Sequence, residues 1–449
     1  MRRLRTRGLD PLVLISAFLV LVTAAFAALT FAHPGSGRSR GPREVPYTTA
    51  LRACPGTGSG STIRAGSLGS GSAPLMTRHG TAAPASGGTI NSLRTTDISG
   101  SGQPTTLMVA GLAAAGLVTG AYGTNPLSGT RCAEPASDYW FTGLGSSSTH
   151  DSIIEIDNPA ETQATIELTT YSSNAGAGPS TDTRVLAAHG SVSIDLFKTT
   201  PAYGVYAVHA EVTQGQAMVS VLDQVLTPGQ PGLSDWLVPQ VGPHTAVTLL
   251  GLPRGTHQTL TVANPSGDQL TARVQLITKS TVFAPAKFAG VTVPGNGVAT
   301  ADLSAILANA KDVVGIEVDA PTGVTASLST VVGNDLAITG LDPILIAEGG
   351  AVLPDGGKTL VVGAAQSAGS VTVTGRDSSG KLVFQRAIAV TTTGAISVGL
   401  PSNTVLVQLQ TGTVRARAAV VVTGNGAIVV PVTGVIRVSS VPYVRPGLD

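Results

Sequence analysis

The chain has 449 residues, which is long enough for three domains of ordinary size. Apolar residues make up 42% and charged residues 12%, so the composition predicts a packed, β-rich protein with many turns and excludes a disordered one. A net charge of +1 leaves no basic footprint for nucleic acid, and we expect no nucleic-acid partner.

The amino-terminal residues predict export from the cytoplasm. Residues 1–11 form a basic cytoplasmic segment, and residues 12–32 are uncharged and long enough to cross a bilayer as a helix. Because a basic flank stays in the cytoplasm, we expect a single-pass cell-membrane protein anchored through residues 12–32, with an extracytoplasmic body. The alternative is a signal peptide cleaved near Ala25-Phe26-Ala27, which would give a secreted protein. Residues 33–44 are rich in Pro, Gly and Ser and predict a flexible stalk.

The only two cysteines, Cys54 and Cys132, are expected to form a disulfide in an exported chain. The alternative is two unpaired buried thiols. A metal site is not expected, because no histidine lies at ligand spacing from either cysteine. The surrounding segment, 45–137, is rich in Gly, Ser and Ala. It is interpreted as loops and strands that pack on the module at 138–240. Two stretches in it predict strands, 106–112 and 117–122.

The remainder of the chain contains repeats. Asn158-Pro159 returns as Asn264-Pro265, an offset of 264 − 158 = 106. Two more pairs keep nearly the same offset, Asp195 with Asp302 (302 − 195 = 107) and Glu211 with Glu317 (317 − 211 = 106). A third, more diverged copy begins near Ala351. We therefore expect three modules in series, at 138–240, 241–346 and 347–449.

Short strands bounded by turn signals are typical of a β-sandwich of immunoglobulin or fibronectin type. The predicted fold is all-β, with tandem sandwiches of this kind after an N-terminal transmembrane helix. A short helix is expected within 303–311. Period-two alternation predicts equivalent core positions at Ile154, Ile166, Leu168, Leu260, Val262, Val274 and Leu276. If the modules are separate, a charge at Leu276 should unfold only its own module.

Three motifs carry a resemblance to a known family. They are Cys132-Ala-Glu-Pro135, then Asp138-Tyr-Trp-Phe-Thr-Gly143, then a Gly/Ser turn leading to Asn158-Pro159. Together they resemble the actinobacterial exported family called domain of unknown function 5719, in which the Asn-Pro pair lies in a hairpin. The resemblance implies an envelope protein of unassigned activity and supplies no catalytic residues.

No catalytic, cofactor or metal site is expected from the sequence. No serine lies in a Gly-x-Ser-x-Gly elbow, and no His-Glu-x-x-His motif is present. The adjacent His150 and Asp151 are interpreted as part of a solvated turn. Tyr139, Trp140 and Phe141 form the densest aromatic cluster. We expect them in a core, with contact to a glycan or partner as the alternative.

The sequence therefore favours a non-catalytic extracytoplasmic interaction or scaffold protein of the cell envelope. The alternative is a module that binds cell-wall glycan or peptidoglycan through the Trp140 region, which an exposed aromatic surface there would favour. A secreted hydrolase is a remote alternative, and it would require a Ser/His/Asp cluster in a pocket.

Overall fold

The computed structural model describes residues 20, 22–23, 43–56, 59–124, 126–174, 176–200, 203–226, 229 and 232–441. This part of the chain is nearly all β, as the composition predicts. It divides into a small unit, Met1–Val45 with Val438–Asp449, and a large unit, Pro46–Arg437. In the small unit, β1 (Arg43–Pro46) pairs with β34 (Val438–Val441).

The predicted membrane anchor receives no support from the structure. Among the described residues, no helix has the length and apolar character that a bilayer crossing needs. Apart from Val20, Val22 and Thr23, the segment 12–32 lies outside the described residues, as do residues 1–11 and most of the stalk.

The first module (46–135) contains two four-stranded sheets, in the orders β2-β7-β4-β5 and β6-β3-β8-β9. The sequence predicts loops and two strands here, at 106–112 and 117–122. Both strands are present, as β7 and β8, and further strands fill most of the rest of the segment. Six of the fourteen buried residues of its core are alanines, which weakens the alternation of large apolar and polar residues that marks a strand. The elements are β2 (Thr49–Cys54), β3 (Ser59–Ser67), β4 (Ser72–His79), β5 (Ala85–Asn91), β6 (Thr95–Ser101), β7 (Thr105–Ala110), η1 (Leu112–Ala114), β8 (Leu117–Thr124) and β9 (Leu127–Arg131).

The second module (138–240) repeats this strand order, as β10-β15-β12-β13 and β14-β11-β16-β17. Large apolar side chains from both sheets form its core. The elements are β10 (Asp138–Gly145), β11 (His150–Asp157), β12 (Ala164–Ser172), β13 (Ser180–Leu186), β14 (Ser191–Asp195), α2 (Leu196–Thr199), β15 (Val205–Gln214), β16 (Met218–Val225) and β17 (Leu233–Trp236).

The third module (244–341) keeps the order, but one long strand, β24, belongs to both sheets. The sheets run β18-β24-β20, with β21 and β22 on β20, and β23-β19-β24-β25. The predicted short helix is present as α3. The elements are β18 (His244–Leu250), β19 (Thr256–Asn264), β20 (Leu270–Ile277), β21 (Val282–Phe283), β22 (Val291–Val293), β23 (Gly297–Asp302), α3 (Ser304–Asn309), β24 (Gly315–Val332) and β25 (Asp335–Thr339).

The fourth module (345–434) has the same arrangement, with β31 as its long shared strand. Its sheets run β29-β28-β31-β26-β33 and β30-β27-β31-β32. The elements are β26 (Leu345–Val352), β27 (Gly357–Gly363), β28 (Gly369–Arg376), β29 (Leu382–Val390), β30 (Ala395–Leu400), β31 (Leu406–Gly424), β32 (Gly426–Pro431) and β33 (Thr433–Gly434). Strand order thus repeats four times in the described part of the large unit.

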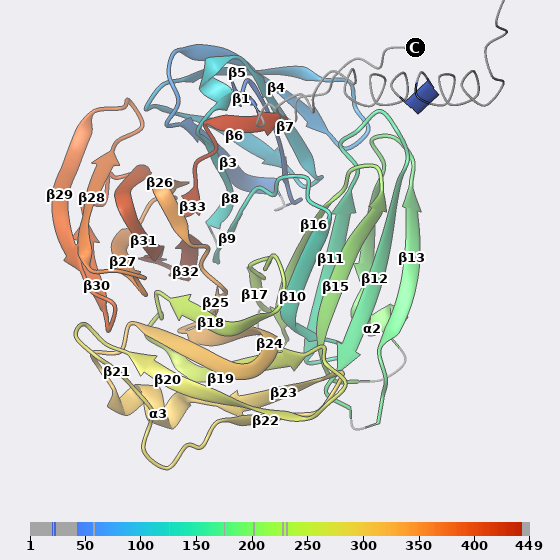
Figure 1. Ribbon diagram of the computed structural model, residues 1–449, viewed down its shortest axis with the longest axis vertical. Coiled ribbons are helices and arrows are strands. Elements are labelled where there is room, and N and C mark those ends of the chain that lie inside the picture. The colour runs from blue at the N-terminus through green and yellow to red at the C-terminus, as the bar shows by residue number, and fades with distance from the viewer. Residues whose placement is uncertain are drawn as a thin grey trace, which may run out of the picture. The chain divides into compact units, whose positions relative to one another are not determined.

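Within the large unit the modules close into a ring (Figure 1). The last main strand of each module, β9, β17, β25 or β32, lies at the centre and contacts its neighbours there. The fourth module returns to the first, because the Tyr122 hydroxyl donates to the Val352 carbonyl at 2.5 Å and Arg64 donates to the Leu353 carbonyl at 2.6 Å.

The Asn-Pro element does not form the hairpin that the family resemblance implies. β11 pairs with β14 and β16, while β12 pairs with β13 and β15, so the turn carries the chain from one sheet to the other. Asn158 is buried, and its amide donates to the carbonyls of Thr162 and Ala187. Asn264 does the same at Asp268 and Pro294, which explains why the pair repeats.

Candidate functional site

The cysteine prediction is confirmed. Cys54 at the end of β2 and Cys132 just after β9 form a disulfide, with their Cα atoms 4.2 Å apart. Both are buried in the core of the first module. Because β2 and β9 belong to different sheets, the bond ties the two sheets of this module together.

The aromatic cluster lies inside the protein. Tyr139, Trp140 and Phe141 on β10 are all buried, and Phe141 has no exposed surface. The Tyr139 hydroxyl donates to the Glu134 carbonyl at 2.6 Å, while Trp140 stacks on His209 with ring centroids 4.3 Å apart. The exposed aromatic surface that would favour glycan binding is therefore not formed by these three side chains.

Two buried aspartates join modules at the centre of the ring. Asp235 of β17 accepts hydrogen bonds from the amides of Gly129 in the first module, at 3.1 Å, and Ile338 in the third, at 3.0 Å. Asp335 of β25 accepts from the amide of Ala427 in the fourth module at 3.1 Å. Burial raises the pKa of Asp235 well above its usual range and the pKa of Asp335 to about 7.

Further acidic groups occupy the other joints. Glu155 accepts from the Gly56 amide at 3.0 Å, and Asp157 accepts from the Thr106 hydroxyl at 3.3 Å; both bonds link the second module to the first. Burial raises the pKa of Asp157 to about 6. At the other end of the third module, Arg417 of β31 donates to the backbone carbonyl of Asp342. We call the contacts of Glu155, Asp157, Asp235 and Asp335 the carboxyl joints.

A Ser/His/Asp cluster exists in the second module, but its geometry is not that of a nucleophile and its base. The Ser152 hydroxyl donates to Asp223 at 2.5 Å and accepts from the Gly145 amide at 2.8 Å. His150 contacts the same carboxylate at 2.9 Å. Although burial alone would lower the pKa of His150, the Asp223 carboxylate raises it. Because the Ser152 hydroxyl donates to Asp223 and not to His150, the cluster lacks the serine-to-histidine hydrogen bond of a nucleophile and its base.

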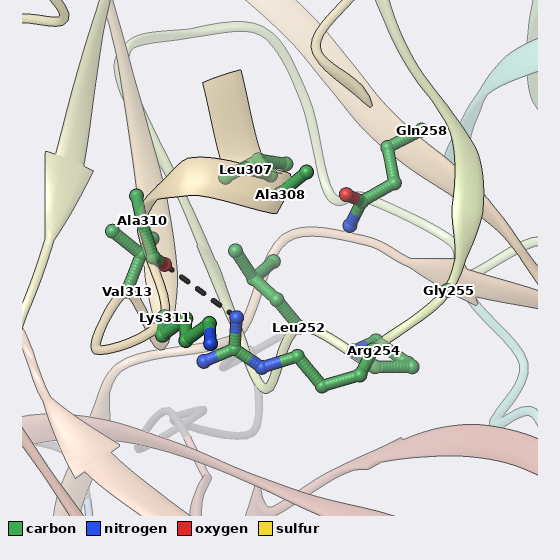
Figure 2. Close-up of a pocket in the computed structure, with 10 residues that line it drawn as sticks. Leu252, Arg254, Gly255, Gln258, Leu307, Ala308, Ala310, Lys311 and Val313 are labelled. Carbon is green, nitrogen blue, oxygen red and sulfur yellow. Dashed lines mark hydrogen bonds between the residues drawn. The ribbon is translucent and has the colours of Figure 1, made fainter. Parts of the chain in front are cut away.

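A cavity of about 400 Å³ opens in the third module between α3 and the loop at 252–255 (Figure 2). Its apolar wall is Leu252, Leu307 and Val313, which pack with the module core. Arg254 and Lys311 supply two cationic groups, and no carboxylate lines the cavity. The Arg254 guanidinium donates to the Ala310 carbonyl at the end of α3, at 3.5 Å.

An exposed aromatic pair lies in the second module. Phe197 of α2 and Tyr203 stack with ring centroids 6.0 Å apart, and they are 38% and 70% exposed. The adjoining residues Leu196, Thr199 and Thr200 line a cavity of about 260 Å³ that reaches the apolar side chains between the two sheets.

Sequence reasoning did not identify the carboxyl joints, the Phe197–Tyr203 pair or the cavity beside Arg254. Asp235 and Asp335 stand in no motif, because their partners are backbone amides. Phe197 and Tyr203 flank Thr199-Thr200-Pro201, and an aromatic on either side of a Pro turn is the signal that was available. The Arg254 cavity depends on bringing residues 252–258 next to 307–313, which no local pattern encodes. Among the described residues, no cluster of His, Cys, Asp or Glu could hold a metal ion.

Comparisons with known proteins bear on family and not on activity. No curated protein matches the sequence. A solved structure titled "Crystal structure of tetra-tandem repeat in extending region of large adhesion protein" is 14% identical and covers 88% of this chain and 99% of its own. With a TM-score of 0.11, this likeness carries no argument. The Family of unknown function (DUF5719) matches residues 74–401, and the chain belongs to that family.

Proposed function

We propose that this chain is a non-catalytic scaffold or interaction protein of the cell envelope. The observation that carries the proposal is the placement of the buried acidic groups. Carboxyls with strongly shifted pKa values are the usual candidates for catalysis. Here Asp235 and Asp335 accept backbone amides from neighbouring modules instead of facing a cavity, so they act as joints.

We infer that the modules are a variant of the immunoglobulin and fibronectin class. In the immunoglobulin order, the first strand lies beside the second and the seventh beside the sixth. In the second module the first strand, β10, lies beside the sixth, β15, and the seventh, β16, lies beside the second, β11. The variant thus exchanges the places of the first and seventh strands while the rest of the pairing fits the class.

The extracytoplasmic location rests on the basic, apolar amino terminus and on the pairing of both cysteines, because disulfides persist in oxidising compartments. A reporter that is active only when exported, fused after Asp449, should be active in cells. Activity of a reporter that works only in the cytoplasm would contradict the proposal.

A scaffold needs a surface for its partner, and the open edge of β29 is one. Within the described residues, β29 pairs only with β28, so the other edge of β29 has free backbone groups for an added strand. A photo-crosslinker at the exposed Gln385 in intact cells should capture a defined envelope component. The same group at the exposed turn residue Asp268 is the control. Equal, diffuse labelling from both positions would contradict a specific partner at this edge.

Glycan binding is the second candidate, and the Phe197–Tyr203 pair favours it over the buried Trp140 region. Exposed aromatic faces can stack on sugar rings. Tyr203→Ala should reduce retention on purified cell-wall glycan, while Phe283→Ala, a partly exposed aromatic of the third module, should not. Absence of retention by the unaltered protein would remove this candidate.

A further inference from the structure

The cavity between α3 and the loop at 252–255 contains a buried polar group that protein contacts leave unused. Gln258 is 5% exposed, and its amide points into the cavity (Figure 2). The backbone amide of Gln258 bonds Ser304, but its side chain makes no hydrogen bond to a described residue. The side-chain amide of Gln258 therefore has donor and acceptor capacity for a molecule in the cavity.

The charge at the mouth of the cavity is also unbalanced. Arg254 and Lys311 form no ion pair with any described residue. The Ala310 carbonyl accepts one guanidinium N–H of Arg254 at a long distance, 3.5 Å, and so orients the side chain without neutralising it. An anion placed here would meet two cations and no opposing carboxylate in the cavity lining.

We propose that this cavity binds a small carboxylate that carries an amide and an apolar side chain, as an N-acylated amino acid or the carboxyl terminus of a peptide does. Each part of such a molecule has a counterpart in the lining. The carboxylate lies at Arg254 and Lys311, the amide exchanges hydrogen bonds with Gln258, and the apolar side chain packs on Leu252, Leu307 and Val313. The volume of about 400 Å³ is within the range of small-molecule sites.

The test is calorimetric titration of the full chain with N-acetyl-leucine. Two probes each lack one feature: N-acetyl-leucinamide has no charge, and N-acetylglycine has no apolar side chain. N-acetyl-leucine should bind saturably and the two probes at least about tenfold more weakly, since a charged hydrogen bond or a buried side chain contributes about that factor. Absence of saturable binding by N-acetyl-leucine, or equal binding of the uncharged amide, would overturn the proposal.

Variants assign the binding to this cavity. Arg254→Gln, Lys311→Gln and Gln258→Leu should each weaken binding of N-acetyl-leucine by about tenfold. Arg273→Gln, which removes an exposed arginine of β20 in the same module, is the matched control and should leave binding unchanged. Gln258 is buried, so the Gln258→Leu result counts only if hydrogen exchange of the third module is unaltered. If exchange is altered, the Arg254→Gln and Lys311→Gln variants decide the test, because both side chains are exposed. An equal effect of Arg273→Gln would contradict the site.

A peptide ending in leucine distinguishes the two sources of the ligand. If the natural ligand is a peptide terminus, the free-acid peptide should bind more tightly than N-acetyl-leucine and its amidated form should not bind. If it is a free acylated amino acid, the peptide should bind more weakly than N-acetyl-leucine. Equal affinity of the free-acid and amidated peptides would overturn the proposal. The outcome is independent of the scaffold function, which concerns β29 and the carboxyl joints.

Discussion

The first and fourth modules have the same strand order but hold it by different means. The core of the first combines six alanines, among them Ala65, Ala73 and Ala121, with six larger aliphatic side chains and the disulfide. The core of the fourth is mainly Val, Leu and Ile. Alanine side chains bury little apolar surface, so the first module buries less per core residue than the fourth and adds a covalent bond to its packing. Strand order therefore does not require one kind of core.

Removing the disulfide should give the largest difference between the two modules. Cys54→Ser with Cys132→Ser releases a loop with a sequence separation of 78 residues, which is worth roughly 4–5 kcal/mol of unfolding free energy. Hydrogen exchange should accelerate in β2 and β8 before it does in β27. Equal acceleration of all strands would mean that the bond does not act on its own module.

Truncating a large core side chain should strongly destabilise the fourth module, whose core depends on packing. Leu409 of β31 is fully buried, and Leu409→Ala should lower the free energy of unfolding by about 2–5 kcal/mol because it leaves a cavity. Leu382→Ala on β29, at a largely exposed position, is the control and should cost less than about 0.5 kcal/mol. Thermal unfolding of both variants measures the difference, and similar losses would contradict a packed core at Leu409.

Removing the carboxyl of Asp235, which contacts the first module but not the fourth, should lower the free energy of unfolding by a smaller amount. Asp235→Ala leaves the Gly129 and Ile338 amides without their acceptor, at a cost of about 1–3 kcal/mol. Asp312→Ala, at an exposed position, is the control. Chemical denaturation should separate the two variants, and equal midpoints would show that the carboxyl joint does not stabilise the ring.

The pH dependence tests the joints without removing a side chain. The pKa values of Asp335 and Asp157 are raised to about 7 and about 6, so the folded state binds more protons than the unfolded state between about pH 4 and pH 7. The free energy of unfolding should therefore fall as pH rises through this window. Asp335→Asn should reduce the slope between pH 6 and 7, whereas Asp268→Asn should not. Rising stability across the window would contradict buried carboxyls at the joints.

The strong periodic signals of the sequence predicted local structure well. Ile154, Leu260 and Leu276 are all buried, and α3 lies within the predicted helical stretch, because each depends on spacing along a single element. In the first module the sequence predicted β7 and β8 but not the other strands, because small residues such as Ala, Ser and Gly alternate weakly. Sheet membership was missed at Asn158, since a turn that changes sheets and a hairpin turn use the same residues.

The candidate sites were less predictable for a physical reason. Cys54 and Cys132 could be paired because only one pairing exists. Trp140 could be assigned to a core because aromatics are few. The cavity of Arg254, Gln258 and Lys311, in contrast, combines a loop with the end of a helix about fifty residues later, and such convergence is a property of the tertiary fold.

The predicted module boundaries near 240 and 346 can be compared with the positions of the strands. The first lies between β17 and β18, and the second falls within β26. Whether each module folds alone stays a prediction of the sequence. Contacts in the ring favour modules that depend on their neighbours to fold. Leu68 and Tyr122 of the first module belong to the core of the fourth, and Leu336 and Ile338 of the third belong to the core of the second.

The central claim is that contacts between modules, including the carboxyl joints, make the modules unfold together. Limited proteolysis of the Leu276→Asp protein tests it. A charge at this fully buried position should unfold the third module at a cost of several kcal/mol. If the joints couple the modules, residues 138–240 and 346–437 should be digested along with the third module, while Thr271→Asp at an exposed position of β20 leaves the protein resistant. Survival of the second and fourth modules as protease-resistant fragments would contradict coupled unfolding and support independent modules in series.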